Sequence, residues 1–232
     1  MADRIRWGIA GTGGIASSFA ADLKLLPDAE IVAVGSRGRA SADAFADRFD
    51  IPHRHVGYAA LAADPEVDAV YVAVPHTGHR EAALAAIAER KAVLVEKPFT
   101  VNAAEAEEMI TAAREAGTFL MEAMWVRFLP HFAHVRELLA EGRIGEVRAV
   151  IADRGEVLST DPLHRVNNPG LAGGALLDLG VYPVSFASMV TGGKLPARIE
   201  AVARLTGTGV DAQSSMIFEY PDGAHEIGRA HV

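Results

Sequence analysis

The chain has 232 residues, half of them apolar and 22% charged, which is an ordinary composition for a soluble globular protein of one large or two small domains. Its formal net charge of −8 argues against nucleic acid as the main partner, because phosphate binding needs a basic surface, and the absence of cysteine excludes disulfides and thiolate chemistry. With no run of 18 apolar residues and no room for a signal peptide before the first strand, we expect a cytoplasmic protein without membrane contact.

The first predicted strand, 5–10, runs directly into a glycine turn in which Gly11, Gly13 and Ala16 fit the pattern G-x-G-x-x-G/A. Glycines let the backbone turn sharply and approach a pyrophosphate, whose charge meets the N–H groups at the start of the helix predicted over 15–26. An ordinary tight turn is the alternative, but the position between a strand and a helix favours a dinucleotide site. We therefore expect the cofactor to contact Gly11, Thr12, Gly13, Gly14 and Ile15.

The turn after the second predicted strand, 31–34, indicates which dinucleotide is bound. Dinucleotide sites that hold a ribose 2′-OH usually place an acid at this point, but this chain has Ser36, Arg37 and Arg39 there. Guanidinium groups suit a 2′-phosphate, so we expect NADP rather than NAD, with Ser36 and Arg37 as contacts. The alternative is a pair of solvated arginines at the start of the helix predicted over 41–49.

A third site segment follows the strand predicted over 67–74, which is apolar enough to be central in the sheet. Because the carboxyl ends of parallel strands border the ligand crevice, we expect Pro75, His76 and His79 to lie near the nicotinamide. Each histidine has an alternative role as a cap of the helix predicted over 80–90.

The strand predicted over 92–95 ends in Glu96, Lys97 and Pro98, and we expect Glu96 and Lys97 to contact the cofactor. An ammonium group at this place is partly desolvated, which lowers its pKa and makes Lys97 a candidate proton donor or acceptor beside the cofactor. Pro98 keeps Lys97 extended and so directs its side chain. A surface lysine paired with Glu96 is the alternative. A helix over 102–115 and a strand over 118–121 complete the alternation.

The alternation of strands and helices stops near residue 123, which predicts one domain over 1–122 and a second over 123–232. The second domain begins with an aromatic and basic segment that contains Trp125 and Arg127. A helix over 131–141 carries His131 and His134, which we interpret as structural because no third metal ligand accompanies them, so no metal site is predicted. Strands are expected over 146–154, 198–206 and 213–220.

The helix predicted over 175–190 carries Asp178 and Tyr182. Residues four apart lie on the same face of a helix, so the carboxylate is expected to orient the phenol or to tune its pKa. The alternative is an acid favoured by the helix dipole beside a half-buried tyrosine.

Four segments together resemble the Gfo/Idh/MocA family of oxidoreductases, within it the branch that oxidises dihydrodiols and sugars with NADP. They are the glycine turn, the Glu96–Pro98 segment, the Trp125–Phe128 segment, and Gly173–Pro183 with the sequence GGALLDLGVYP. The resemblance implies an α/β fold: a doubly wound parallel Rossmann sheet, followed by an α/β domain with a mostly antiparallel open sheet that often forms a dimer face. His76 stands where many relatives carry Asn, and Tyr182 stands where many carry His.

The resemblance further implies an NAD(P)-dependent dehydrogenase that acts on the CH–OH group of a sugar or cyclic diol. Lys97, in a cis or strained Lys97–Pro98 segment, would relay the proton, while Tyr182 would hydrogen-bond the reacting oxygen and Asp178 would position the substrate or the tyrosine. Trp125 and Arg127 would line the substrate pocket. The alternative is a non-catalytic regulator that senses a nucleotide or sugar on the same fold.

The second domain of this family normally continues beyond the length seen here, so the chain is expected to be truncated at its C-terminal side. Residues 226–232, EIGRAHV, match the translation of a common sequencing adapter, which suggests that the genuine sequence ends near His225. The truncated domain is expected to have an open sheet edge, and the chain can then be inactive although its family is catalytic. The full-length form is expected to be a homo-oligomer.

Overall fold

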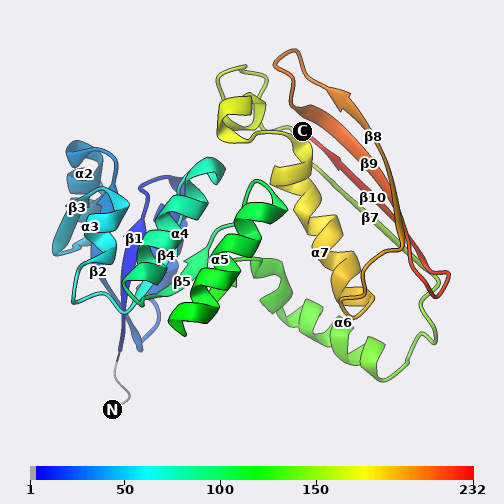
Figure 1. Cartoon of the computed structure of the whole chain (residues 1–232), viewed down its shortest axis with the longest axis horizontal. Coiled ribbons are helices and arrows are strands. Elements are labelled where there is room, and N and C mark those ends of the chain that lie inside the picture. The colour runs from blue at the N-terminus through cyan, green and yellow to red at the C-terminus, as the bar shows by residue number, and fades with distance from the viewer. Residues whose placement is uncertain (1–3) are drawn as a thin grey trace. The chain divides into compact units, whose positions relative to one another are not determined.

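The computed structural model describes residues 4–232 and divides the chain into two compact units, Met1–Ala123 and Met124–Val232. The boundary lies one residue after the predicted one. Figure 1 shows both units, and each is described by itself below.

The first unit is a six-stranded parallel sheet in the order β3-β2-β1-β4-β5-β6. The order reverses between β1 and β4, as in a doubly wound Rossmann sheet, and confirms the predicted fold. Its elements are β1 Ile5–Ala10, α1 Gly14–Leu23, β2 Ala29–Ser36, α2 Arg39–Phe49, β3 His53–Val56, α3 Tyr58–Ala62, β4 Ala69–Val72, α4 His79–Ala88, β5 Ala92–Val95, α5 Ala103–Ala116 and β6 Leu120–Glu122.

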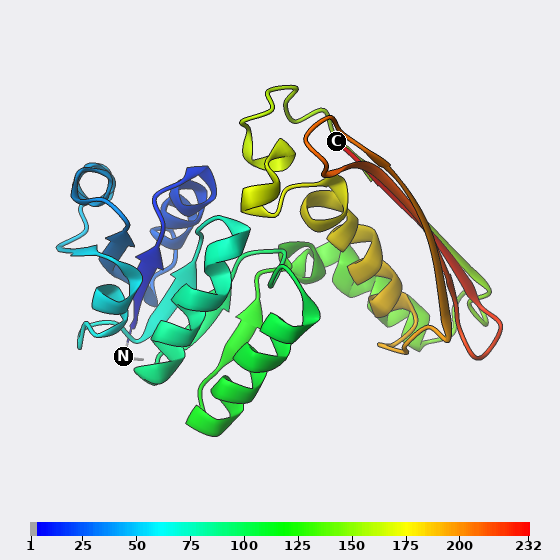
Figure 2. The same cartoon turned by 45° about the horizontal axis from the view of Figure 1, so that its top comes forward.

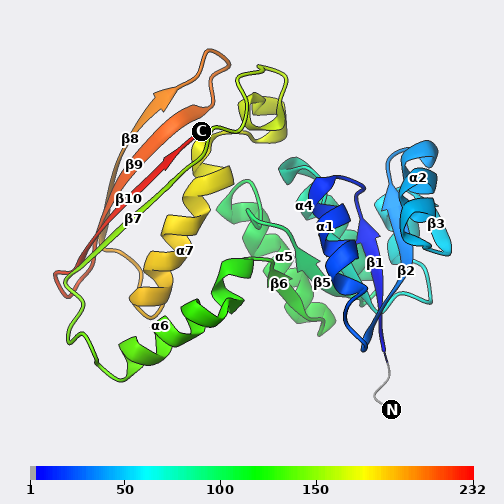
Figure 3. The ribbon, with the colours of Figure 1, turned by 180° about the vertical axis from the view of Figure 1, so that it is seen from behind.

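Helices cover both faces of this sheet. On one face, α1 and α2 pack Leu23, Phe45 and Phe49 against the strands. Figure 3 shows these two helices from that side. On the other face, α3, α4 and α5 pack residues such as Leu61 and Met109. Strands β2 and β4 are buried on both faces along most of their length, which is why their sequences are mostly continuous apolar runs rather than alternating ones.

The second unit contains a four-stranded sheet in the order β7-β10-β9-β8. Strand β10 pairs parallel to β7 and antiparallel to β9, and β8 pairs antiparallel to β9, so the sheet is mixed. Its elements are the 3₁₀ turn η2 Trp125–Phe128, α6 Pro130–Ala140, β7 Ala149–Gly155, the 3₁₀ turns η3 Arg165–Asn167 and η4 Pro169–Leu171, the π-helical turn η5 Leu176–Gly180, α7 Val181–Val190, β8 Arg198–Leu205, β9 Asp211–Glu219 and β10 His225–His231.

One face of this second sheet is covered. Burial alternates along β9 and β10, and Met216 and Phe218 on the inner face pack with Val184 of α7. Figure 2 shows the sheet with helices on one side, and within residues 124–232 no helix lies on the other side. The segment 226–232, predicted to be adapter-derived, forms most of β10, and its origin remains a prediction.

The stretch Pro169–Val190 has the length and mean hydropathy, 1.3, of a segment that can cross a membrane. Within that stretch, 44% of the most apolar window is buried in the protein. Because an interior helix of a water-soluble protein meets the same criteria, this stretch is weak evidence for a membrane span.

Candidate functional site

The glycine turn after β1 has the backbone conformation that its sequence predicts. Gly11 has a φ of +111°, and a Cβ built on it would lie 2.4 Å from the carbonyl oxygen of Ala73. A larger residue would therefore collide with the backbone at the end of β4. Around Gly13 and Gly14, by contrast, no atom of residues 4–232 outside the adjoining backbone lies within 4 Å of a built Cβ, so the space beside the turn is open.

Helix α1 begins at this open space. Gly13 precedes its first turn, and in the described part of the chain no side chain caps that turn and no acid lies in it. The N–H groups at a helix start carry partial positive charge, so this end suits an anion. Ile15 is 52% exposed, which leaves its apolar side chain available to a ligand, and Thr12 is partly buried in the turn.

The turn after β2 carries the residues predicted to read the ribose. Ser36 is buried and its Oγ lies 2.7 Å from Oγ of Ser41. Arg37 is exposed, whereas Arg39 donates from a guanidinium nitrogen to the carbonyl oxygen of Arg54 at 3.2 Å. Of the two arginines, Arg37 is therefore the better placed to bind a phosphate.

His79 differs from its predicted role as a cofactor contact. Its side chain has no exposed surface, so it has none to offer a ligand. Its Nε2 lies 3.0 Å from the carbonyl oxygen of Val74 and its Nδ1 lies 2.9 Å from that of Pro98, and burial lowers the pKa of the ring. His79 thus joins the segments that follow β4 and β5. Pro75 and His76 lie in the turn between β4 and α4, where Pro75 is exposed and His76 is partly buried.

Lys97 lies in a segment that several side chains hold in place. The Lys97–Pro98 bond is cis, one of the two forms, cis or strained, that the family resemblance implied. The backbone N–H of Lys97 donates to Oε2 of Glu96 at 3.2 Å, and the N–H of Phe99 donates to Oε1 of Glu122 at 2.9 Å. With His79 on the carbonyl of Pro98, each residue from 97 to 99 has a polar contact to a different side chain.

The Glu96 carboxyl is partly buried and bonds a tyrosine of the neighbouring strand. Tyr71, a fully buried residue of β4, donates its hydroxyl to Oε1 of Glu96 at 2.5 Å. Burial raises the pKa of Glu96, while the hydrogen bonds from Tyr71 and from the Lys97 N–H oppose that rise. The carboxyl therefore links the end of β5 to β4 and holds the backbone from which the Lys97 side chain extends.

In the second unit, Asp178 is a buried carboxylate, 2% exposed, in an ion pair that the sequence did not indicate. Arg165 donates from both terminal nitrogens, at 2.9 Å to Oδ1 and 3.2 Å to Oδ2 of Asp178. The predicted continuous helix is also wrong in part, because Leu176–Gly180 is a π-helical turn and the α-helix begins at Val181. The simple four-residue spacing argument for Asp178 and Tyr182 therefore does not apply.

Tyr182 lines a pocket of about 440 Å³ in the second unit. The indole N–H of Trp125 donates to its hydroxyl at 3.3 Å, and the guanidinium of Arg154 lies 5.9 Å from the centre of its ring. Phe132 and Phe186 also line the pocket, which therefore combines aromatic walls with a few polar groups. Arg127 lies on the same turn as Trp125 but outside the lining of this pocket.

Sequence reasoning missed the roles of Tyr71, Glu122 and Arg165. Glu122 ends the last strand of the first sheet, where a polar residue after an apolar run is a usable signal. Tyr71 and Arg165 gave no such signal, because their partners are distant in the sequence and only the fold brings them together.

Two family models match the chain. Residues 5–124 match the model described as oxidoreductase family, NAD-binding Rossmann fold, and residues 132–230 match the GFO/IDH/MocA C-terminal domain. The two matches fall on the two structural units, one on each.

Among named relatives, the chain is 44% identical over 223 residues to trans-1,2-dihydrobenzene-1,2-diol dehydrogenase of Bos taurus, which is 95% of this chain and 66% of the relative. Among solved structures, the 3-ketoreductase KijD10 of Actinomadura kijaniata, in complex with NADP and TDP-benzene, is 33% identical with a TM-score of 0.87 over 98% of this chain and 70% of that one. GenD2 from gentamicin A biosynthesis, in complex with NAD, is 27% identical with a TM-score of 0.90 over 99% of this chain and 66% of that one.

Proposed function

The chain belongs to the GFO/IDH/MocA family of oxidoreductases, and we propose that it acts as an NADP-dependent dehydrogenase on the CH–OH group of a sugar or cyclic diol. The names of its relatives support the reaction class, since they include a dihydrodiol dehydrogenase and a 3-ketoreductase. The chain spans 66% of the length of the Bos taurus relative. The activity of this chain is therefore proposed and is not taken over from the relative.

The observation that carries the proposal is the glycine turn at the point where the strand order reverses. Gly11 is held against the backbone of Ala73, while the space beside Gly13 and Gly14 is open and α1 points its uncapped start toward it. These features suit a diphosphate, so Gly11 to Ile15 would hold the cofactor. When bound, the nicotinamide supplies the hydride chemistry, and the protein supplies orientation and proton transfer.

Lys97 is the proposed proton relay. It follows β5, next but one to β1 in the sheet, and its backbone is held on both sides by Glu96, His79 and Glu122. An amine on a backbone that is held by so many contacts is suited to general acid–base catalysis, which depends on position as much as on pKa. In the second unit, Tyr182 and Trp125 are the proposed substrate contacts, because both line the same aromatic pocket.

Replacing Lys97 with Met tests the relay. Lys97→Met should reduce turnover on a panel of sugars and cyclic diols at least about 100-fold, because general acid–base catalysis contributes on that scale, while NADPH binding stays within about twofold. Lys24→Met, which removes an exposed lysine paired with Asp50, is the matched control and should leave turnover unchanged. The proposal is refuted if the complete protein turns over no member of the panel in either direction, or if it keeps most of its rate with Lys97→Met.

The preference for NADP rests on Arg37. A fluorescence titration should show NADPH bound more tightly than NADH, and Arg37→Ala should weaken NADPH about tenfold with little effect on NADH, since one charge-assisted contact is worth about 1.4 kcal/mol or more. Arg114→Ala, an exposed arginine on α5, is the control. Tighter binding of NADH by the original chain would reverse the preference.

We also propose that the complete protein is a homo-oligomer that buries the uncovered face of the second sheet. Ile151 of β7 and Ile217 of β9 stand at the same level on that face, each opposite Ile227 of β10. Ile151 and Ile217 are 71% and 50% exposed, and exposed apolar patches of this kind mark association surfaces.

A further inference from the structure

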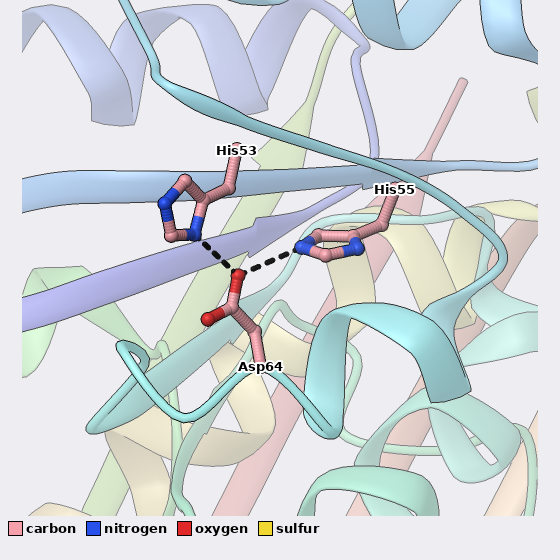
Figure 4. A group of neighbouring side chains, drawn as sticks. All are labelled: His53, His55 and Asp64. Carbon is pink, nitrogen blue, oxygen red and sulfur yellow. Dashed lines mark hydrogen bonds and ion pairs between the residues drawn. The ribbon is translucent and has the colours of Figure 1, made fainter.

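A cluster of three metal-ligating side chains lies in the first unit, at residues that belong neither to the glycine turn nor to the Lys97 segment. His53 and His55 come from the edge strand β3, and Asp64 follows helix α3. Figure 4 shows both imidazoles directed at one carboxylate oxygen: His53 Nδ1 lies 2.6 Å and His55 Nε2 lies 2.8 Å from Oδ2 of Asp64. These three atoms all lie within 4.8 Å of one another.

The sequence places the two histidines together, because residues two apart on a strand share one face. Asp64 is oriented by its own contacts: Oδ1 accepts the N–H of Glu66 at 2.9 Å, which leaves Oδ2 toward the imidazoles. Lys91 donates to the carbonyl oxygens of Asp64 and Val67, at 3.1 and 2.7 Å, and so holds the same turn. Supporting contacts of this kind are what orient ligands at metal sites.

The burial of Asp64 also suits a bound ion. Its side chain is 4% exposed, and Oδ1 already accepts the N–H of Glu66, so one buried carboxylate oxygen is left facing the two imidazoles.

We propose that His53, His55 and Asp64 bind a divalent transition-metal ion of the Zn²⁺ type. Two imidazole nitrogens and a carboxylate oxygen are a donor set that such ions accept, with water in the fourth position. The His53 side chain is 40% exposed, which gives an ion and its water a way in. Ligand bonds of about 2.0–2.2 Å require donor atoms about 3.3 Å apart, so the two hydrogen bonds need to open by about half an ångström.

Binding exchanges two hydrogen bonds for coordination. In the metal-free cluster each imidazole donates its N–H to Oδ2 of Asp64; on binding, these protons leave or move to the other ring nitrogen, and the ion takes their place. The ion would join the edge strand β3 to the segment between α3 and β4. Because it binds the folded cluster only, it stabilises the first unit.

The chain contains its own matched control. His131 and His134 lie on α6, and His134 makes an exposed contact with Glu137 at 3.4 Å. The described residues include no further histidine, aspartate or glutamate that completes a group of three around that pair. The cluster on β3 thus has three converging donor atoms, whereas the α6 site has only a pair of histidines.

The test is calorimetric titration of tag-free, chelator-treated protein with ZnCl₂, followed by Co²⁺ absorption as a check on coordination. We expect one Zn²⁺ per chain and a raised thermal midpoint. His53→Ala, His55→Ala and Asp64→Asn should each weaken binding at least about tenfold, because loss of even an indirect supporting contact costs that much. The double variant His131→Ala/His134→Ala should bind as the original chain does.

Two results would overturn the proposal. One is that the original chain binds no more Zn²⁺ than the His53→Ala chain does. The cluster would then be only a set of hydrogen bonds between β3 and the segment after α3. The other is unchanged binding in all three cluster variants. His53→Ala removes the most exposed member and so is the variant least expected to unfold, and circular dichroism confirms that each tested variant is folded.

Discussion

At the scale of single residues, two glycines of the same turn have different tasks. Gly11 cannot carry a Cβ, because its φ is +111° and Ala73 stands behind it, whereas Gly13 has a φ of −81° and open space. The first glycine therefore serves the fold, and the second is the one proposed to make room for the ligand.

Gly11→Ala should lower the free energy of unfolding by about 3 kcal/mol, from backbone strain together with overpacking. Gly13→Ala should change stability by less than about 0.5 kcal/mol, but it should weaken NADPH binding because its methyl group enters the diphosphate space. Urea unfolding and NADPH fluorescence titration measure the two effects. Equal stability losses in both variants would contradict this division.

Glu226 is the least satisfied acid of the second unit. It is 1% exposed on β10, and neither carboxylate oxygen has a hydrogen-bond partner within the described residues. Burial raises the pKa of its carboxyl to about 7 from an ordinary value of 4.5. The folded chain therefore holds this proton to higher pH than the unfolded chain does.

Stability should consequently fall as the pH rises from about 4.5 to about 7, since deprotonation then favours the unfolded chain. Urea midpoints at pH 5 and pH 8 should show a larger drop for the original chain than for Glu226→Gln, which cannot titrate. Glu226→Leu should raise the free energy of unfolding at pH 8 by about 2 kcal/mol, the cost of an unpaired buried polar group. Identical pH profiles in the original and Gln chains would contradict the assignment.

At the scale of elements, the π-helical turn Leu176–Gly180 and the irregular segment before it are joined by one ion pair. The Asp178 side chain is 3% exposed and that of Arg165 is 49% exposed, so the carboxylate bears the cost of burial. The pair holds the turn in the place from which α7 begins.

Arg165→Met should destabilise the chain by about 3 kcal/mol, because it removes the bidentate partner of a buried carboxylate. The double variant Arg165→Met/Asp178→Leu should recover most of that loss, since two apolar groups leave no buried charge. Urea unfolding measures both. A loss below about 0.5 kcal/mol for Arg165→Met would show that other contacts of Asp178 are sufficient.

The sequence predicted regular elements well and contacts between distant residues poorly. Apolar runs and glycine turns are local, so the Rossmann alternation and the Gly11 turn could be found, and the family resemblance supplied the cis Lys97–Pro98 bond. The π-helical turn has the same apolar pattern as an α-helix, so it could not be distinguished. The burial of His79 and the convergence of His53 and His55 on Asp64 depend on which segments the fold brings together.

At the scale of the whole molecule, each unit carries one of the two tryptophans. Trp7 lies on β1, with its ring 5.5 Å from that of Phe19, and Trp125 lies in η2. In a Trp125→Phe chain, fluorescence therefore reports the unfolding of the first unit alone.

NADPH at about 100 times its Kd should raise the stability of that unit by about 2.7 kcal/mol, because it binds the folded state only. The same concentration of NADH should give a smaller shift. The readout is the urea midpoint of Trp7 fluorescence, with Gly13→Ala as the control that loses the effect. A midpoint that NADPH does not move would argue against a dinucleotide site.

Association through the second sheet should depend on the row of isoleucines on its uncovered face. Ile217→Glu, in the middle strand pair, should shift the sedimentation profile toward monomer, since a charge in an apolar interface opposes association. Glu200→Gln, on the neighbouring strand and opposite Ile217, is the control. Equal sedimentation of the original and Ile217→Glu chains at all concentrations would contradict an interface there.

The position of β10 between β7 and β9 has a consequence for synthesis on the ribosome. The first unit pairs strands that are close in the sequence, so it can fold while the remainder of the chain is still being made. In the second unit, β7 emerges early but its neighbour β10 is made only after α7, β8 and β9. Until then the nascent β7 has an unpaired edge, and chaperones that shield such edges are expected to engage it during that interval.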